Sequence, residues 1–161
     1  MSRAVIAFGA NLGDREATIG AAVRELADAP GMRLVAVSPV YETAAVKLDG
    51  VDREAPRYLN GVVVVETELD PHALLDLLHR IEHDHGRTRD ERWGDRTLDL
   101  DLVDVDGLRI SDDRLELPHP RAWERAFVLQ PWLDVEPDAQ LAGRGRVADL
   151  RAAATDEVVR R

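Results

Sequence analysis

Asp99 and Asp101 alternate with Leu98, Leu100 and Leu102 in one short stretch of the sequence. A period of two is typical of a β-strand with one buried face, so we expect the leucines to face a core and the carboxylates to point the other way. Aspartates at this spacing have Cα atoms about 6.5 Å apart, close enough to share a cation or hold two. Mg²⁺ usually takes one or two carboxylates and completes its shell with phosphate oxygens and water. The pattern therefore indicates either a magnesium site or a solvated strand face.

Four arginines, Arg87, Arg89, Arg92 and Arg96, precede the aspartates in a chain whose formal net charge is −10. A planar guanidinium can hold two phosphate oxygens in a bidentate fork. Beside an acidic pair, such a cluster favours a site for a cation together with a phosphorylated ligand. Composition offers a plainer alternative, because Lys47 is the only lysine and arginine is the default cation of this chain.

The glycines near the N-terminus, Gly9, Gly13 and Gly20, do not form a familiar nucleotide loop. They lack the spacing of a dinucleotide-binding turn and are not followed by Gly-Lys-Ser/Thr. We interpret Gly9 and Gly13 as parts of a tight connection from a strand to a helix. Phosphates must then be held by other groups.

Two histidine positions are further candidates for binding a ligand. His79 and Glu82 are three residues apart and share a helix face, which suits a hydrogen bond to a nucleotide or to solvent better than a metal site, because no second such pair accompanies them. His119 is held between Pro118 and Pro120 in a stiff turn. A ligand contact and a structural role are equally open for it.

Trp93 and Phe127 are the aromatic candidates. Trp93 lies in a polar run where no periodicity would bury it, so it is either a stacking platform for a planar ligand or an anchor for its loop. Phe127 has helical spacing with Trp123 and Leu133, which a core position would also explain.

Length and composition restrict the class of protein. We expect residues 1–161 to form a single domain, because a chain of this size can hide roughly two-thirds of its unfolded surface. The absence of cysteine excludes disulfides and thiolate metal sites. The first apolar run, residues 4–8, is too short for a signal peptide, and no run approaches the ~20 residues of a membrane span. We expect a cytoplasmic monomer with no membrane partner, and the net negative charge argues against nucleic acid as a partner.

Hydrophobic patterns and turn signals predict the elements that position these residues. Strands are predicted over 4–9, 34–41, 58–68 and from 98 onward, and helices over 16–26, 71–85, 121–133 and 147–154. The helix at 71 is clearest, since Asp70 can cap it and Pro71 suits its first position. The first six elements follow the order β-α-β-β-α-β, so we predict an α+β fold, a ferredoxin-like antiparallel sheet with C-terminal additions. The polar loop 43–57 is long enough to act as a lid.

Residues 92–101 resemble the signature of the 6-hydroxymethyl-7,8-dihydropterin pyrophosphokinase family, which reads Arg-Trp-Gly-x-Arg-Thr-Leu-Asp-Leu-Asp. The match has no mismatched position. Shorter matches flank it in order, at 9–13, 58–60, 80–82, 86–89 and 117–119. The resemblance therefore covers nearly the whole chain.

The resemblance implies an enzyme of the folate pathway that moves the β,γ-pyrophosphoryl group of ATP to the hydroxymethyl oxygen of the pterin and releases AMP. It implies two Mg²⁺ ions held by Asp99 and Asp101, with Arg87 and Arg96 on the transferring phosphates. The expected contacts of ATP are His79, Glu82, Arg89, Trp93, Arg96, Leu102, Arg114, His119 and Arg125. The expected contacts of the pterin are Thr43, Val46, Tyr58, Asn60, Trp93 and Phe127, where the Asn60 amide offers both a donor and an acceptor.

The sequence departs from the family pattern in the loop after Thr43. Ala44 and Ala45 stand where many members have proline, and the acidic stretch 49–54 lengthens the loop. These changes are expected to affect closure of the loop and not the chemistry. His79 stands where some members have glutamine.

Two other classes of function compete with this interpretation. A non-catalytic ferredoxin-like module would bind ATP without turning it over, since this fold serves unrelated functions. A two-metal nucleotidyl transferase would release pyrophosphate instead of AMP. Analysis of the products distinguishes the three.

Overall fold

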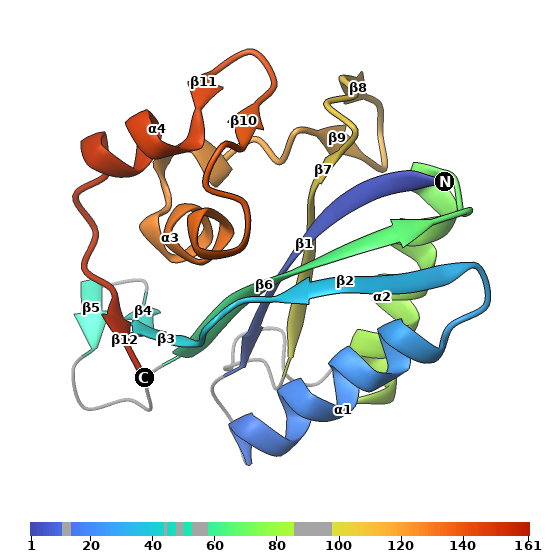
Figure 1. Cartoon of the computed structure of the whole chain (residues 1–161). Helices are drawn as coiled ribbons and strands as arrows, with labels where there is room; N and C mark the ends of the chain where they lie inside the picture. Colours follow the sequence, from blue (N-terminus) through green and yellow to red (C-terminus); the bar gives the residue numbers. More distant parts are fainter. Residues whose placement is uncertain (11–13, 44, 48–49, 53–57, 86–97) are drawn as a thin grey trace.

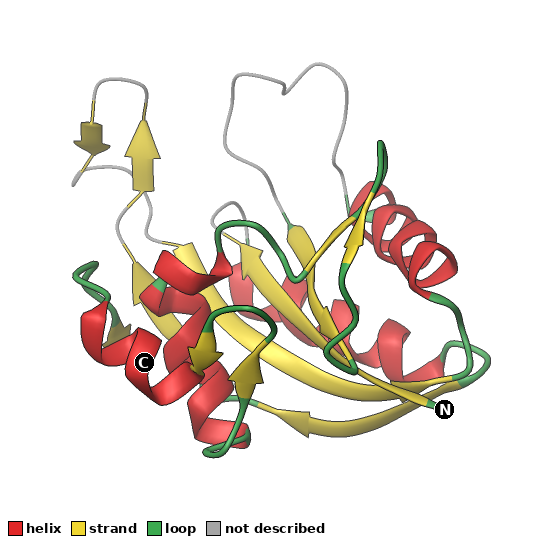
Figure 2. Cartoon of the chain, turned by 90° about the horizontal axis from the view of Figure 1, so that it is seen from above, coloured by secondary structure: helices red, strands yellow, loops and turns green. Residues whose placement is uncertain are grey.

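A computed structural model describes residues 1–10, 14–43, 45–47, 50–52, 58–85 and 98–161. A six-stranded sheet forms its centre (Figures 1 and 2). Helices α1 (Arg15–Asp28) and α2 (Pro71–Asp84) lie on one face, and α3 (Ala126–Val135), with α4 (Val147–Ala153) packed against it, lies on the other. The combination of helices with antiparallel strands confirms the predicted α+β class. Within the described ranges, no helix is long and apolar enough to cross a membrane.

The order of the elements along the chain agrees with the predicted order, with additional short strands. The elements are β1 (Ser2–Ala10), α1 (Arg15–Asp28), β2 (Met32–Val37), β3 (Tyr41–Thr43), β4 (Ala45–Lys47), β5 (Gly50–Asp52), β6 (Tyr58–Thr67), α2 (Pro71–Asp84), β7 (Asp99–Val105), β8 (Ile110–Ser111), β9 (Glu116–Leu117), η2 (Ala122–Glu124), α3 (Ala126–Val135), β10 (Gln140–Leu141), β11 (Gly145–Arg146), α4 (Val147–Ala153) and β12 (Val159–Arg160). The predicted β-α-β-β-α-β series corresponds to β1, α1, β2, β6, α2 and β7.

β6 lies at the centre of the sheet. β1 pairs with one of its edges, and β2 and β3 pair with successive parts of the other, all antiparallel. β7 pairs with β1, and β12 pairs with β3, at the two ends of the order β12-β3-β6-β1-β7. Because helices cover both faces, residues 62–65 of β6 are all fully buried. A strand buried on both faces needs apolar side chains at every position, which explains why these four residues are all valine and do not alternate with polar residues.

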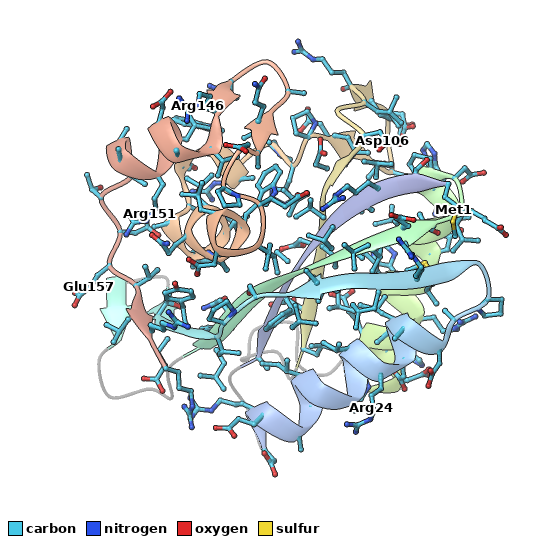
Figure 3. The ribbon with its side chains drawn as sticks, in the orientation of Figure 1. Met1, Arg24, Asp106, Arg146, Arg151 and Glu157 are labelled. Carbon is cyan, nitrogen blue, oxygen red and sulfur yellow. The ribbon has the colours of Figure 1, made fainter. Side chains whose placement is uncertain are left out.

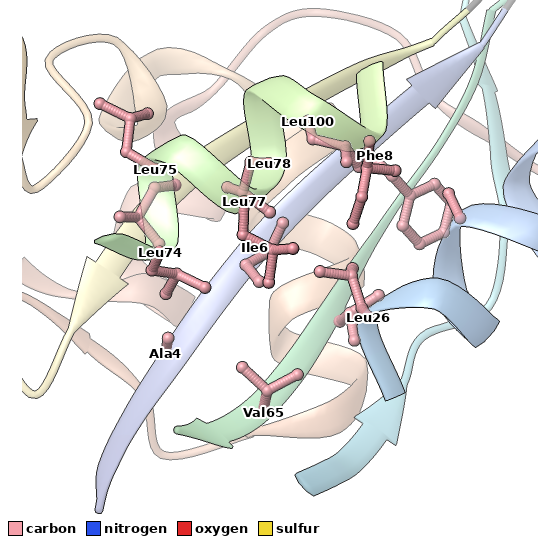
Figure 4. Packing of buried hydrophobic residues seen from close by; sticks show 14 of the residues in the cluster. Ala4, Ile6, Phe8, Leu26, Val65, Leu74, Leu75, Leu77, Leu78 and Leu100 are labelled. Carbon is pink, nitrogen blue, oxygen red and sulfur yellow. The ribbon is translucent and has the colours of Figure 1, made fainter. Parts of the chain in front are cut away.

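Successive side chains of β1 enter two different cores. Ile6 and Phe8 pack with α1 and α2 (Figure 4), whereas Val5 and Ala7 pack with α3. Gly61 of β6 lies directly against the ring of Phe8, and a Cβ added at Gly61 would lie 2.3 Å from Phe8 Cζ. A glycine is therefore required where this ring crosses the neighbouring strand.

Aspartate caps begin both helices that cover the first face. The Asp14 carboxylate accepts a hydrogen bond from the N–H of Ala17 at 3.1 Å, and that of Asp70 accepts one from Ala73 at 2.8 Å. Each cap satisfies an N–H group that has no acceptor inside its own helix. The predicted start of the helix at residue 71 is thereby confirmed.

The strand predicted over 34–41 is wrong in its middle, because it is two strands. β2 ends at Val37 and β3 begins at Tyr41. Between them, the Ser38 hydroxyl accepts a hydrogen bond from the N–H of Val62 at 2.9 Å, and Pro39 has no N–H to offer to a ladder. β4 and β5 lie inside the predicted loop 43–57, and β12 was not predicted.

The helix predicted over 121–133 is also wrong at its start. A short 3₁₀ turn, η2, is followed by Arg125 in an extended conformation (φ −108°, ψ 105°), and α3 begins only at Ala126. Apolar residues on either side of Arg125 keep a helical spacing, so the period alone does not show the break.

Asp104 is an acidic residue buried in the sheet. The charged side chains labelled in Figure 3 lie around the outside of the molecule, but Asp104 is only 8% exposed. Its Oδ2 accepts a hydrogen bond from the N–H of Gly107 at 3.4 Å, and its Oδ1 has no hydrogen-bond partner among the described residues. Burial, together with the negative charges of Asp106 and Glu136, raises the pKa of Asp104. The ionised carboxylate therefore destabilises the fold.

We expect Asp104→Asn to stabilise the protein at neutral pH. Below the unfolded-state pKa of about 4, Asp104 is protonated in both the folded and the unfolded protein, so its burial as a charge costs no stability. Above the raised folded-state pKa, the full cost of burying the carboxylate is present. An amide of the same shape removes the buried charge, which should raise the free energy of unfolding by about 1 kcal/mol at neutral pH. Thermal unfolding across the pH range measures this. An equal increase in the free energy of unfolding at about pH 4 would contradict the explanation that a buried charge destabilises the protein.

Candidate active site

β7 presents its two aspartates on the face opposite its leucines. Leu98, Leu100 and Leu102 are buried in the core shared with α1 and α2, whereas Asp99 is half-buried and Asp101 is exposed. The alternation predicted from the sequence is therefore confirmed. The two carboxylates therefore lie on the same side of the sheet.

Contacts on both edges fix the course of β7. One edge pairs with β1. On the other side, Glu82 of α2 accepts a hydrogen bond from the N–H of Leu100 at 2.8 Å, and the N–H of His119 donates to the carbonyl of Val103 at 2.9 Å. Glu82 is only 3% exposed, so its hydrogen bond to the N–H of Leu100 is shielded from water. α2 and the turn at His119 thus position the strand that carries the aspartates.

A cavity of about 590 Å³, here called the α3 cavity, is bounded by the sheet, the start of α3 and the tail that follows α4. Its lining residues are Ala7, Phe8, Gly9, Thr43, Tyr58, Asn60, Asp99, Asp101, Arg121, Glu124, Arg125, Phe127, Thr155 and Asp156. Four residues expected to contact a pterin and both expected metal ligands are therefore brought together. Arg125, expected to contact the nucleotide, lies with them.

Polar and aromatic groups line the α3 cavity from different elements. The Asn60 Nδ2 donates to the Thr43 hydroxyl at 2.8 Å, and Asn60 is only 6% exposed. Gly9 leaves room for this amide, because a Cβ there would lie 3.1 Å from Asn60 Oδ1. At the start of α3, the Arg125 guanidinium carbon lies 5.5 Å from the centroid of the Phe127 ring. The cavity suits a planar ligand with a polar edge.

A second cavity of about 290 Å³, here called the α2 cavity, lies on the other side of Asp101. Its lining residues are Leu75, His79, Glu82, Leu100, Asp101, Leu102, Arg114, Leu115, Glu116, His119 and Pro120. Five of the residues expected to contact ATP are among them. Asp101 lines both cavities, so the acidic pair stands where the two meet.

His119 is a hydrogen-bond donor in the α2 cavity. Burial and the charges of Arg125 and Arg121 lower its pKa, against the opposing effect of Asp101 and Glu116. The imidazole is therefore neutral at neutral pH. Its Nδ1 accepts a hydrogen bond from the N–H of Arg121 at 3.3 Å, so the neutral ring carries its hydrogen on Nε2.

Several expected site residues lie outside the part of the chain that the structure describes. They are Arg87, Arg89, Trp93 and Arg96, together with the side chain of Val46. Their roles remain predictions.

The α3 cavity also contains residues that the sequence did not single out. Arg121 and Glu124 belong to the segment predicted to be a regular helix, and Thr155 and Asp156 belong to the C-terminal tail. No motif or period marks these four positions. Only the packing of the tail against α3 brings the last two to the site.

The acidic pair fits a cation that a nucleotide helps to hold. In the described portion of the chain, no three Asp, Glu or His side chains are grouped closely enough to bind a metal ion alone. Asp99 and Asp101 supply two carboxylates, which suits Mg²⁺ because this ion keeps water and takes its other ligands from phosphates. The donor set therefore favours Mg²⁺ shared with a phosphorylated ligand.

Comparison with known sequences finds the same family that residues 92–101 resemble. The profile of the family described as 7,8-dihydro-6-hydroxymethylpterin-pyrophosphokinase (HPPK) matches residues 5–137. The chain is 42% identical over 143 residues to 2-amino-4-hydroxy-6-hydroxymethyldihydropteridine pyrophosphokinase of Methylorubrum extorquens, covering 89% of this chain and 88% of that protein. It is 40% identical over 161 residues to the protein of the same name from Pseudomonas aeruginosa, covering 100% and 97%.

The fold also resembles a crystal structure of Plasmodium falciparum HPPK-DHPS, with a TM-score of 0.71 and 14% identity. The superposition covers 94% of this chain but 45% of that one, so the chain spans less than half of that longer protein. At this identity, the likeness shows the fold alone.

We expect Glu82→Ala to destabilise the protein and loosen β7. The substitution leaves the buried N–H of Leu100 without its acceptor, which costs about 1–3 kcal/mol. Glu82→Gln is the matched control, because its amide oxygen can accept the same hydrogen bond, and it should lose less than half as much. Urea unfolding measures both. Equal losses in the two variants would contradict the role of the acceptor.

Proposed function

The chain belongs to the 7,8-dihydro-6-hydroxymethylpterin-pyrophosphokinase family, and from that premise we propose that it transfers a pyrophosphoryl group from ATP to 6-hydroxymethyl-7,8-dihydropterin in folate biosynthesis. One observation carries the proposal. Asp101 lines both the α2 and the α3 cavity, with Asp99 beside it in the latter. Two substrates bound one in each cavity would meet at the carboxylates that hold the cation.

The pterin is assigned to the α3 cavity. Phe127 offers a ring on which the pterin can stack, and Thr43, Tyr58 and Asn60 offer polar contacts. One N–H of the Asn60 amide donates to Thr43, so its second N–H and its amide oxygen are the groups left to donate to and accept from the pterin. Trp93 and Val46 are expected to complete the site.

ATP is assigned to the α2 cavity. His79, Leu102 and Arg114 lie along its walls, and His119 can donate from Nε2 to a nucleotide oxygen. Glu82 lies here too, but its carboxylate holds the N–H of Leu100, so its effect on the nucleotide is exerted at least in part through β7. Arg87, Arg89 and Arg96 are the residues expected on the phosphates.

In the proposed reaction, the hydroxymethyl oxygen of the pterin forms a bond to the β-phosphorus of ATP. The bond between that phosphorus and the oxygen bridging to the α-phosphate breaks, so AMP leaves with the bridging oxygen and its electron pair. The hydroxyl proton is released. Two Mg²⁺ ions held by Asp99, Asp101 and phosphate oxygens would neutralise the developing negative charge.

The proposal also covers the number of domains and the topology of the sheet. We take residues 1–161 as a single domain and the order β2-β6-β1-β7 as a ferredoxin-like sheet. Antiparallel pairing through these four strands, with α1 and α2 on one face, supports this assignment. α3 is then an addition on the other face, where it supplies one wall of the α3 cavity.

Product analysis tests the function. Protein supplied with Mg²⁺, ATP and 6-hydroxymethyl-7,8-dihydropterin should release AMP and the pterin diphosphate in equal amounts, measured by chromatography. Release of pyrophosphate would instead indicate a nucleotidyl transferase. ATP binding with no turnover would indicate a non-catalytic module.

We expect Asp99→Asn and Asp101→Asn each to lower kcat by about 100-fold or more, because a neutral amide holds Mg²⁺ poorly. Asp113→Asn is the matched control, since it removes the same charge from an exposed position that lines neither cavity. Neither carboxylate of the pair lies in the core, so melting temperatures should change little. Near-normal turnover in either variant would contradict the assigned role.

A further inference from the structure

The start of α3 takes its capping group from the far end of the chain. Arg125, the residue before the helix, makes no side-chain cap bond. Instead, both carboxylate oxygens of Asp156 accept the N–H of Ala126, at 3.0 and 2.9 Å. The first N–H groups of a helix lack intrahelical acceptors and carry partial positive charge, so a carboxylate at this point stabilises the helix start.

Residues on both sides of Ala126 reach the proposed pterin site. Arg125 and Phe127 line the α3 cavity, and the guanidinium of one lies over the ring of the other. Burial lowers the pKa of Arg125, and the carboxylate of Asp156 is among the charges that oppose this effect. The position of the Phe127 ring therefore depends on where α3 begins, and that start is held by Asp156.

The tail that carries Asp156 is fixed at both ends. α4 precedes it, and β12 follows it and pairs with β3, as Figure 1 shows. Beyond β12, the Arg161 side chain forms ion pairs with Glu42 of β3 at 2.6 Å and with Glu16 of α1. β3 also carries Thr43 of the α3 cavity. The tail thus connects the α3 wall of the cavity to its β3 wall.

We propose that Asp156 is a positioning residue for the pterin, and that residues 154–161 are a strap that sets the width of the α3 cavity between Phe127 and Thr43. This inference rests on the proposed pterin function and deepens it. Asp156 also lines the α3 cavity, but both of its oxygens accept the N–H of Ala126, so the residue acts on the pterin site at least in part through α3.

Three variants separate this role from general stability. Asp156→Ala removes the acceptor for Ala126, and Asp156→Asn keeps one acceptor oxygen. Asp70→Ala is the matched control, because Asp70 caps α2 through the N–H of Ala73 at 2.8 Å and lines neither cavity. Calorimetric titration with 6-hydroxymethyl-7,8-dihydropterin and with ATP gives the two dissociation constants, and steady-state kinetics gives the KM for each substrate.

Asp156→Ala should weaken pterin binding about 5-fold, which is about 1 kcal/mol at 1.4 kcal/mol per tenfold. The constant for ATP should change less than about twofold, and Asp156→Asn should restore pterin binding to within about twofold. Asp70→Ala should lower the melting temperature and leave both constants unchanged. Unchanged pterin binding in Asp156→Ala, an equal loss for ATP, or an equal loss in Asp70→Ala would overturn the proposal.

If Asp156→Ala does not fold, Arg161→Ala carries the test, because it frees the end of the strap from Glu16 and Glu42 and leaves Asp156 in place. A selective loss of pterin binding of about threefold or more supports the proposal, and a smaller change overturns it. Failure of the proposed function is distinguishable from these results. A wild-type protein that releases no AMP defeats the function, whereas an active wild type with an unaffected Asp156→Ala defeats this inference alone.

Discussion

The hydrogen bond between the Glu82 carboxylate and the N–H of Leu100 constrains the strand on which the site depends. β7 must bury one row of side chains and present the other row to the two cavities. A slip of one residue would turn Asp99 and Asp101 into the core. Pairing with β1 sets the register on one edge, and the buried carboxylate of α2 holds the other edge. The orientation of the acidic pair therefore depends on the packing of α2 against β7.

The same elements hold β7 and form the α2 cavity. Glu82 and His119 both line that cavity, and each also bonds the backbone of β7, through a side chain in one case and an N–H in the other. A ligand in the α2 cavity therefore contacts groups that are rigidly connected to Asp101. Such coupling favours a preorganised site, in which the acidic pair is held in place before a ligand binds.

A sheet with two helices on one face leaves its other face to be covered by something else. Here α3 and α4 cover it, and the space left beside the start of α3 is the α3 cavity. The cover is held by contacts from distant parts of the chain, including Asp156 at the helix start and β12 on β3. Covering both faces of the sheet also buries Asp104, which lowers the stability of the fold. One oxygen of its carboxyl group has no hydrogen-bond partner among the described residues.

Local sequence signals by themselves determined two features. The period of two determined the facing of the β7 side chains, and Asp70 with Pro71 determined the capped start of α2, because each feature depends on residues close together in the sequence. The signature at 92–101 and its flanking matches indicated the family. Tertiary contacts decided the rest. The break at Arg125, the partner of Glu82 at a separation of 18 residues, and the cap from Asp156 at a separation of 30 all arise where distant segments meet. A repeating pattern records which side of an element is apolar, but it does not record which distant group completes a hydrogen bond.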